Sequence, residues 1–203
     1  MEFKPQLLKP LVTRRLVIKR LTSPRDVGAV REFRKSMDEA YGKPFNEEAY
    51  ADPMAFENGR TKEFPGAVFH AYLRGHKGQA VVRLGVKLDI DRKMRVSYET
   101  HPDFRRQGFA AEAQGAMVKA LAKVYPDLGF AEDHDVGEVA SGRVLINSGY
   151  KIKGIGQTRL FKGWGELRPK GTGRLAFPEI FKGVRYTRPS FSARRKLNPT
   201  CQP

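Results

Sequence analysis

A basic, glycine-containing turn is the part of this chain whose residue types most directly suggest chemistry. It consists of Arg105, Arg106, Gln107, Gly108, Phe109 and Ala110. It follows a strand-like segment ending at Thr100 and precedes a long helical pattern. The first N–H groups of a helix lack partners within the helix and carry partial positive charge, so main-chain donors there can surround a phosphate. The turn therefore predicts a pyrophosphate site, because Gly108 allows close approach and the arginines add charge; a simple helix cap is the alternative.

A second pattern lies about thirty residues further on, at residues 141–150. Ser141 opens a short helical segment that Gly149 closes, and the strand-like residues Tyr150, Lys151 and Ile152 follow. A helix ending in glycine and leading into a strand is typical of the last crossover of an alternating α/β domain.

Together these two motifs resemble the GNAT superfamily of acetyl-CoA-dependent N-acetyltransferases, in particular the branch that acetylates the N-termini of ribosomal proteins. The first motif runs from His101 to Ala113, and the second reads Ser-x-Arg-Val-Leu-x-x-x-Gly-Tyr from Ser141 to Tyr150. The opening residues 14–22, leading to Asp26, also resemble the first strand and helix of that branch. The resemblance covers roughly residues 13–156. It implies an α/β (α+β) fold with a mixed central sheet, an antiparallel N-terminal meander and helices on both faces.

The resemblance also implies acetyl-CoA as cofactor and direct attack of an amine on its thioester. In this family a main-chain N–H of the strand before the phosphate turn meets the acyl carbonyl, which here indicates Tyr98, Glu99 and Thr100. Main-chain N–H groups of residues 107–110 would hold the pyrophosphate. Ser141 is the implied proton donor to the departing thiolate, with a helix N-terminal hydrogen bond as its alternative role.

Two residues depart from the family pattern. Arg95 occupies a position where related sequences commonly carry an acidic residue that serves as general base, and an arginine cannot accept that proton. Glu99 lies four residues along the same strand and therefore on the same face, so it could replace that base or simply pair with Arg95. Glu138 stands where an asparagine commonly precedes the helix serine, which weakens the expectation of the usual pantetheine contacts.

The remaining periodicities predict elements that would position these residues. Three consecutive strands are expected at residues 67–73, 81–90 and 94–100, after a first strand at 16–21 and a helix at about 25–37. A weaker helix is expected at 47–57, and a long one at 108–124, which Pro126 would follow. A short strand at 129–132 completes the pattern.

The segment between the first helix and the meander is acidic in an otherwise basic chain. Residues 36–59 contain six acids and one base, Lys43. This is where the fold normally accepts its amine, so Glu47, Glu48 and Asp52 are the predicted substrate residues that attract a cationic amine or basic peptide. A solvated helix face is the competing explanation.

The net charge of +16 is concentrated at the C-terminal end: residues 1–150 carry a net +5 and residues 151–203 a net +11. We expect a GNAT-like domain at 1–156, an extension with a possible hairpin at 157–183, and a basic, flexible tail at 184–203. The tail would contact nucleic acid or another acidic partner, or serve only as a solubilising segment.

Composition excludes several other classes of function. The single cysteine, Cys201, supports neither a disulfide framework nor a zinc cluster, and the apolar runs are too short to span a bilayer. A cytoplasmic location without membrane contact is expected. The predicted function is acetyl transfer from acetyl-CoA to a primary amine of a protein or peptide rather than of a small molecule. The alternative is a catalytically degenerate GNAT-fold protein that acts as a structural or nucleic-acid-associated component through its basic C-terminal region.

Overall fold

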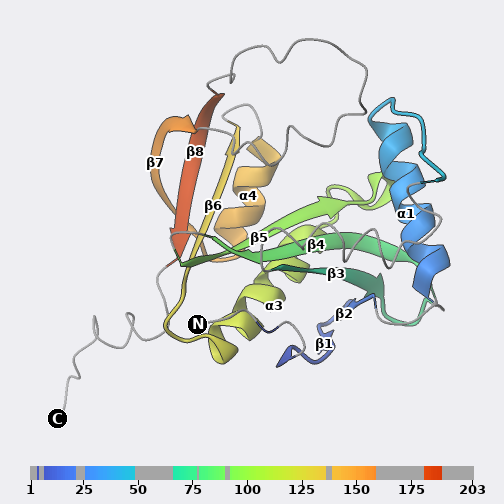
Figure 1. The fold of residues 1–203 in the computed structure, drawn as a ribbon, viewed down its shortest axis with the longest axis horizontal. Coiled ribbons are helices and arrows are strands. Elements are labelled where there is room, and N and C mark those ends of the chain that lie inside the picture. Colours follow the sequence, from blue (N-terminus) through green and yellow to red (C-terminus); the bar gives the residue numbers. More distant parts are fainter. Residues whose placement is uncertain are drawn as a thin grey trace.

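A computed structural model describes residues 4, 7–21, 26–48, 66–76, 78–89, 92–135, 139–158 and 181–188 of the chain (Figure 1). Four helical segments are found among them: α1 (Val27–Ala40), the short 3-10 helix η3 (Pro102–Phe104), α3 (Phe109–Val124) and α4 (Val139–Asn147). The strands are β1 (Leu11–Val12), β2 (Leu16–Arg20), β3 (Gly66–Leu73), β4 (Ala80–Leu88), β5 (Lys93–Thr100), β6 (Gly129–Asp135), β7 (Lys151–Thr158) and β8 (Phe181–Arg188).

The strands form one mixed sheet in the order β1-β2-β3-β4-β5-β6-β8-β7. Strands β2 to β5 pair antiparallel, as the predicted meander requires, and β5 pairs parallel with β6. β6, β8 and β7 pair antiparallel with one another and run at a steep angle to β3, β4 and β5 (Figure 1). The sheet therefore changes direction between β5 and β6.

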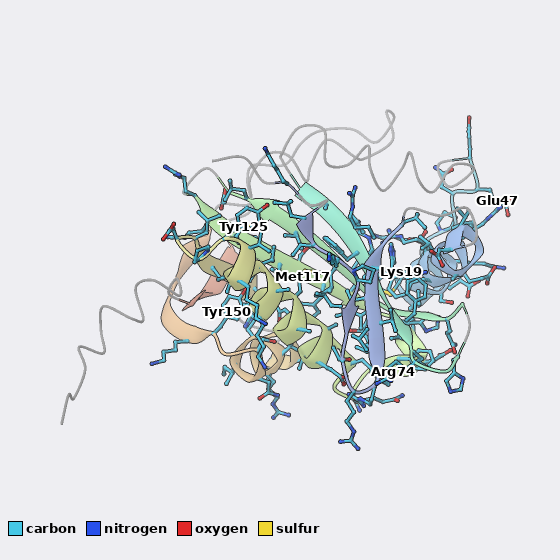
Figure 2. All side chains as sticks on the ribbon, turned by 90° about the horizontal axis from the view of Figure 1, so that it is seen from below. Lys19, Glu47, Arg74, Met117, Tyr125 and Tyr150 are labelled. Atoms are coloured by element: carbon cyan, nitrogen blue, oxygen red, sulfur yellow. The ribbon has the colours of Figure 1, made fainter. Side chains whose placement is uncertain are left out.

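Helices cover both faces of the sheet, so adjacent residues of a central strand, such as Phe69 and His70 of β3, are both buried. α3 packs on the face that carries Phe69, Leu84 and Val96, and its Met117 is fully buried there (Figure 2). α1 lies on the opposite face, where Phe33 packs with Tyr72 in a smaller apolar cluster. None of the helices among the described residues is long and apolar enough to cross a membrane.

The C-terminal part differs from expectation at one boundary. Residues 184–188, predicted as the start of a flexible tail, belong to β8, which pairs with β6 on one side and β7 on the other. The physical reason is local propensity: Val184, Tyr186 and Thr187 favour a strand, and two neighbouring strands satisfy its backbone groups. The expected hairpin at 157–183 lies largely outside the described residues, as do Asp52, Glu138, most of the helix expected at 47–57, and residues 189–203.

Candidate functional site

The predicted anion-binding turn has the backbone conformation that such a site needs. Arg106 and Gly108 both have positive φ, 62° and 79°, and α3 begins at the next residue, Phe109. Glu112 is the first residue whose N–H is paired along the helix, donating to the carbonyl oxygen of Gly108 at 3.1 Å. The turn therefore presents the first N–H groups of α3 from a concave, left-handed stretch of backbone, an arrangement that favours anions.

A clamp from the β1–β2 connection fixes the position of this turn. The carboxylate of Glu112, in the first turn of α3, accepts hydrogen bonds from Thr13 Oγ1 at 2.6 Å, Arg15 N at 3.0 Å and Arg15 Nε at 2.7 Å. Arg15 Nη1 also donates to the carbonyl oxygen of Gln107 at 3.0 Å. Partial burial would raise the pKa of Glu112, but the hydrogen bonds from Thr13 and Arg15 and the charge of Arg15 lower it overall. The carboxylate thus stays ionised and holds the N-terminus of α3 in place.

Three arginines bring positive charge to the turn. The Arg15 guanidinium stacks over the Phe109 ring, 4.1 Å from its centroid, and a Cβ added at Gly108 would lie 3.6 Å from Arg15 Nη2. Arg105 and Arg106 are exposed, and Arg105 Nε donates to the carbonyl oxygen of Thr100 at 3.4 Å. The turn therefore combines main-chain donors with cations, and a side chain at Gly108 would contact the Arg15 guanidinium and be strained by the positive φ.

β5 and β6 separate beside the turn. Their pairing consists of Lys93 with Gly129 and Met94 with Phe130, although the two strands continue to Thr100 and Asp135. Residues 97–100 of β5 therefore form an edge that is not laddered to β6. This edge leads through η3 into the anion-binding turn.

The predicted main-chain donors of β5 divide between its two sides. The N–H and C=O of Val96 bond to Glu132 and Gln114, away from β4, whereas His101 N–H donates to Val81 O on β4. Main-chain groups alternate in direction along a strand. Those of Tyr98 and Thr100 therefore point to the edge facing β6, and those of Glu99 point into the β4–β5 ladder.

The Glu99 side chain lies in a charged cluster under α1. Its Oε2 is 2.9 Å from Arg34 Nη1 and 3.2 Å from Arg83 Nη1. Arg95 pairs instead with Asp89 at 2.6 Å, so the expected pairing of Glu99 with Arg95 is wrong. The alternation of the strand correctly put Glu99 and Arg95 on one face, but the cross-strand neighbour Arg83 and the helix residue Arg34 reach Glu99.

Ser141 is partly buried in the first turn of α4, which begins two residues earlier than expected. Its carbonyl oxygen accepts a hydrogen bond from the Tyr98 hydroxyl at 3.2 Å. This bond connects β5 to α4 across the separation between β5 and β6. Ser141 and Tyr98 are therefore neighbours, as their shared assignment to one site requires.

Two of the predicted substrate acids, Glu47 and Glu48, lie beside α1. Glu47 and Glu48 are exposed in a turn after that helix, and Glu47 Oε1 is 3.7 Å from Arg31 Nη2. Figure 2 shows Glu47 extending outward beside α1. These two acids present charge to solvent and could meet an approaching cation.

Sequence reasoning missed four residues that shape the site: Arg15, Gln114, Glu112 and Glu132. The signals were weak. Arg15 lies in a motif interpreted as a strand, and Glu112 and Gln114 lie in a segment interpreted as a helix, so nothing in the sequence marked them as site residues. Glu132 alone was unusual, as an acid in a segment expected to be a short strand.

The chain has the fold of the GNAT acetyltransferases. An acetyltransferase of the GNAT family from Bacillus anthracis superimposes with a TM-score of 0.65 at 18% identity, covering 89% of this chain and 98% of that one. A ribosomal L7/L12 alpha-N-protein acetyltransferase in complex with coenzyme A gives 0.64 at 12% identity, over 90% and 98%. An acetyltransferase from Salmonella typhimurium that modifies the N-terminal serine of ribosomal protein L7/L12 gives 0.62 at 12%, over 88% and 97%. No protein-family model matches the chain, and no curated protein does.

Proposed function

We propose that this protein transfers the acetyl group of acetyl-CoA to a primary amine, and that the amine belongs to a protein or peptide. One observation carries the proposal: the edge of β5 that leaves β6 at Met94 leads directly to the anion-binding turn at Gly108. A ligand with an extended amide-containing arm and a pyrophosphate fits such a continuous edge and turn. Structural neighbours determined with coenzyme A or acetyl-CoA support the same ligand.

The residues of the chain would divide the work of binding. Main-chain N–H groups of residues 107–110, together with Arg105, Arg106 and Arg15, would hold the pyrophosphate. The main-chain groups of Tyr98 and Thr100 are directed to the open edge and would bind amide groups and the acyl carbonyl. Bound acetyl-CoA supplies the activated thioester. Ser141 is the proposed proton donor to the departing sulfur.

The charged cluster around Glu99 bears on which amine is accepted. Glu99 as general base stays a prediction, but its Oε2 already pairs with the guanidinium groups of Arg34 and Arg83, so a role as their partner is the alternative. Without a strong base the acceptor must itself be partly unprotonated. At pH 7.5 about a third of an α-amino group is neutral, against about 0.1% of a lysine side chain. The α-amine of a peptide N-terminus is therefore the favoured acceptor.

The first test is thermal unfolding with acetyl-CoA, CoA and ATP at matched ionic strength. A ligand at about 100 times its Kd adds about 2.7 kcal/mol, which raises Tm by several degrees for a chain of this size. The Gly108→Glu variant should lose the shift, because a carboxylate would enter the turn. Gly78→Glu is the matched control, since Gly78 also has positive φ, 85°, but lies in the β3–β4 connection. Equal stabilisation of both variants would reject the assignment of the turn.

A catalytically degenerate role is the second candidate. It is favoured by the engagement of Glu99 with Arg34 and Arg83, and by the basic C-terminal quarter of the chain, which could contact nucleic acid. Stabilisation by CoA without acetylation of any peptide N-terminus would support this role. Acetylation of a peptide that depends on Gly108 would reject it.

A further inference from the structure

The separation of β5 from β6 coincides with a buried polar cluster. Met94 of β5 pairs with Phe130 of β6, and a ladder that continued in this register would next pair Val96 with Glu132 on the same faces of the sheet. The ladder does not reach that pair. Instead, the Glu132 side chain accepts the hydrogen bond of the Val96 N–H through its Oε1.

The carbonyl oxygen of Val96 is also hydrogen-bonded to a side chain. Gln114 Nε2, from α3, donates to the Val96 carbonyl oxygen at 2.9 Å, and Gln114 Oε1 accepts from Ser148 Oγ at 3.0 Å. Gln114 is fully buried, and Glu132 and Ser148 are 8% and 5% exposed. Side chains from β6 and α3 thus satisfy both groups that a continuing ladder would use.

This arrangement costs more than the ladder it replaces. A main-chain ladder would satisfy Val96 without removing a carboxylate from water, whereas burying a charged or polar side chain requires compensating hydrogen bonds. The chain could have extended the pairing with an aliphatic residue at position 132. The polar cluster at the point of separation is therefore explained if it prevents the β5–β6 ladder from extending past Met94.

We propose that Glu132 and Gln114 form a wedge that ends the β5–β6 pairing at Met94 and keeps the edge at residues 97–100 open for the amide-containing arm of the ligand. This inference rests on the proposed function and assigns Glu132 a positioning role. The wedge governs binding of the pantetheine arm, whereas the turn at Gly108 governs binding of the phosphates. The two parts of coenzyme A should therefore respond separately to substitution.

The experiment compares CoA with adenosine 3′,5′-bisphosphate, which lacks the pantetheine arm and one phosphate of the pyrophosphate, by calorimetric titration; each variant is compared with the wild-type protein for the same ligand. In Glu132→Val, the loss of the acceptor for Val96 N–H should weaken CoA binding about tenfold, with bisphosphate binding within about twofold of the wild-type protein. Glu132→Gln keeps an acceptor oxygen and should retain both affinities within about threefold. Ser148→Ala removes the hydroxyl that contacts Gln114 Oε1 and also the carbonyl oxygens of Val144 and Ala111, and it should show a smaller loss of the same kind if Glu132→Val does not fold.

Two results would overturn the wedge. One is equal weakening of both ligands, or of neither, in Glu132→Val. The other is loss of acetyl transfer in Glu132→Gln with CoA affinity intact, which would make Glu132 a proton-transfer group.

Hydrogen exchange without ligand separates this inference from the proposed function. If the wedge holds the strands apart, the N–H groups of Tyr98 and Thr100 should exchange more slowly in Glu132→Val than in Glu132→Gln, because the ladder can extend. Equal exchange would reject the wedge even for a protein that binds CoA. A wild-type protein that binds neither CoA nor the bisphosphate would reject the proposed function, while the exchange comparison would still decide the wedge.

Discussion

The clamp on the anion-binding turn yields a prediction in which structure and pH act together. Glu112 connects the first turn of α3 to the β1–β2 connection through Thr13 and Arg15. Glu112→Gln keeps the shape of the side chain but removes its charge. The variant should be less stable at neutral pH and should bind CoA more weakly, because the turn that presents the N–H groups of α3 is no longer fixed.

The magnitude follows from the exposure of the partners. A hydrogen bond to a charged group contributes about 1.5–3 kcal/mol, and solvent screening reduces this at exposed sites. The Glu112 side chain is 19% exposed and that of Arg15 is 39% exposed, so the lower end applies. We expect Glu112→Gln to lose about 1.5 kcal/mol, which corresponds to a Tm lower by about 5 °C.

The pH dependence gives the decisive comparison. The pKa of Glu112 is lowered in the folded protein. Its stabilisation is therefore fully present above the unfolded-state pKa of about 4.3 and is lost as pH falls through the folded-state value. The Tm difference between the wild-type protein and Glu112→Gln should be full at pH 7 and should shrink progressively as the pH falls below about 4. Glu32→Gln, at an exposed position of α1, should show no difference at either pH. A difference that persists unchanged at low pH would refute the reasoning.

Two further predictions concern the acceptor side of the site. Glu99→Gln should destabilise the protein by about 2 kcal/mol, because Arg34 and Arg83 are mostly buried and lose their counter-charge. The same variant should reduce acetyl transfer less than tenfold per folded molecule. A loss of about 100-fold or more with CoA affinity intact would make Glu99 the general base. Neutralising Glu47, Glu48 and Asp52 together should raise the KM for a cationic peptide about fivefold at low salt and leave CoA affinity unchanged. An unaltered KM in that triple variant would mean that the acids form only a solvated surface.

Much of the fold could be predicted from sequence because its signals are local. The strands around Leu84 and Val96 alternate apolar and polar residues, the strand around Phe69 is an almost continuous apolar run, and the helix that begins after Gly108 has apolar residues at helical spacing. The position of β8 between β6 and β7 could not be predicted in this way. It depends on pairing between residues far apart in the sequence, and the charge of residues 184–188 suggested a tail.

The residues of the candidate site also differ in whether local sequence or long-range contacts determine their environment. Gly108 and its neighbours favour a turn through their own backbone preferences, so the turn that is proposed to bind phosphate could be placed from the sequence. The role of Glu99 could not, because it depends on Arg34 and Arg83, which come from α1 and β4. The ion-pair partners of a charged strand residue depend on which elements pack near it in the fold. The alternation of the strand predicts only on which face of the sheet its side chain lies.

The turn and the opening between β5 and β6 would respond differently to a loss of catalytic function. The turn is held by Glu112 together with Thr13 and Arg15 of the β1–β2 connection, none of which belongs to the residues proposed for catalysis, so binding of phosphates can persist in a chain that has lost catalysis. The opening between β5 and β6 instead depends on side chains from β6, α3 and the end of α4 meeting at Val96. Because that cluster buries polar groups at a cost, it would be expected to decay toward an ordinary ladder in a chain no longer selected to bind the arm of a coenzyme. The intact cluster around Glu132 therefore supports the proposed coenzyme A site more strongly than the glycine turn does.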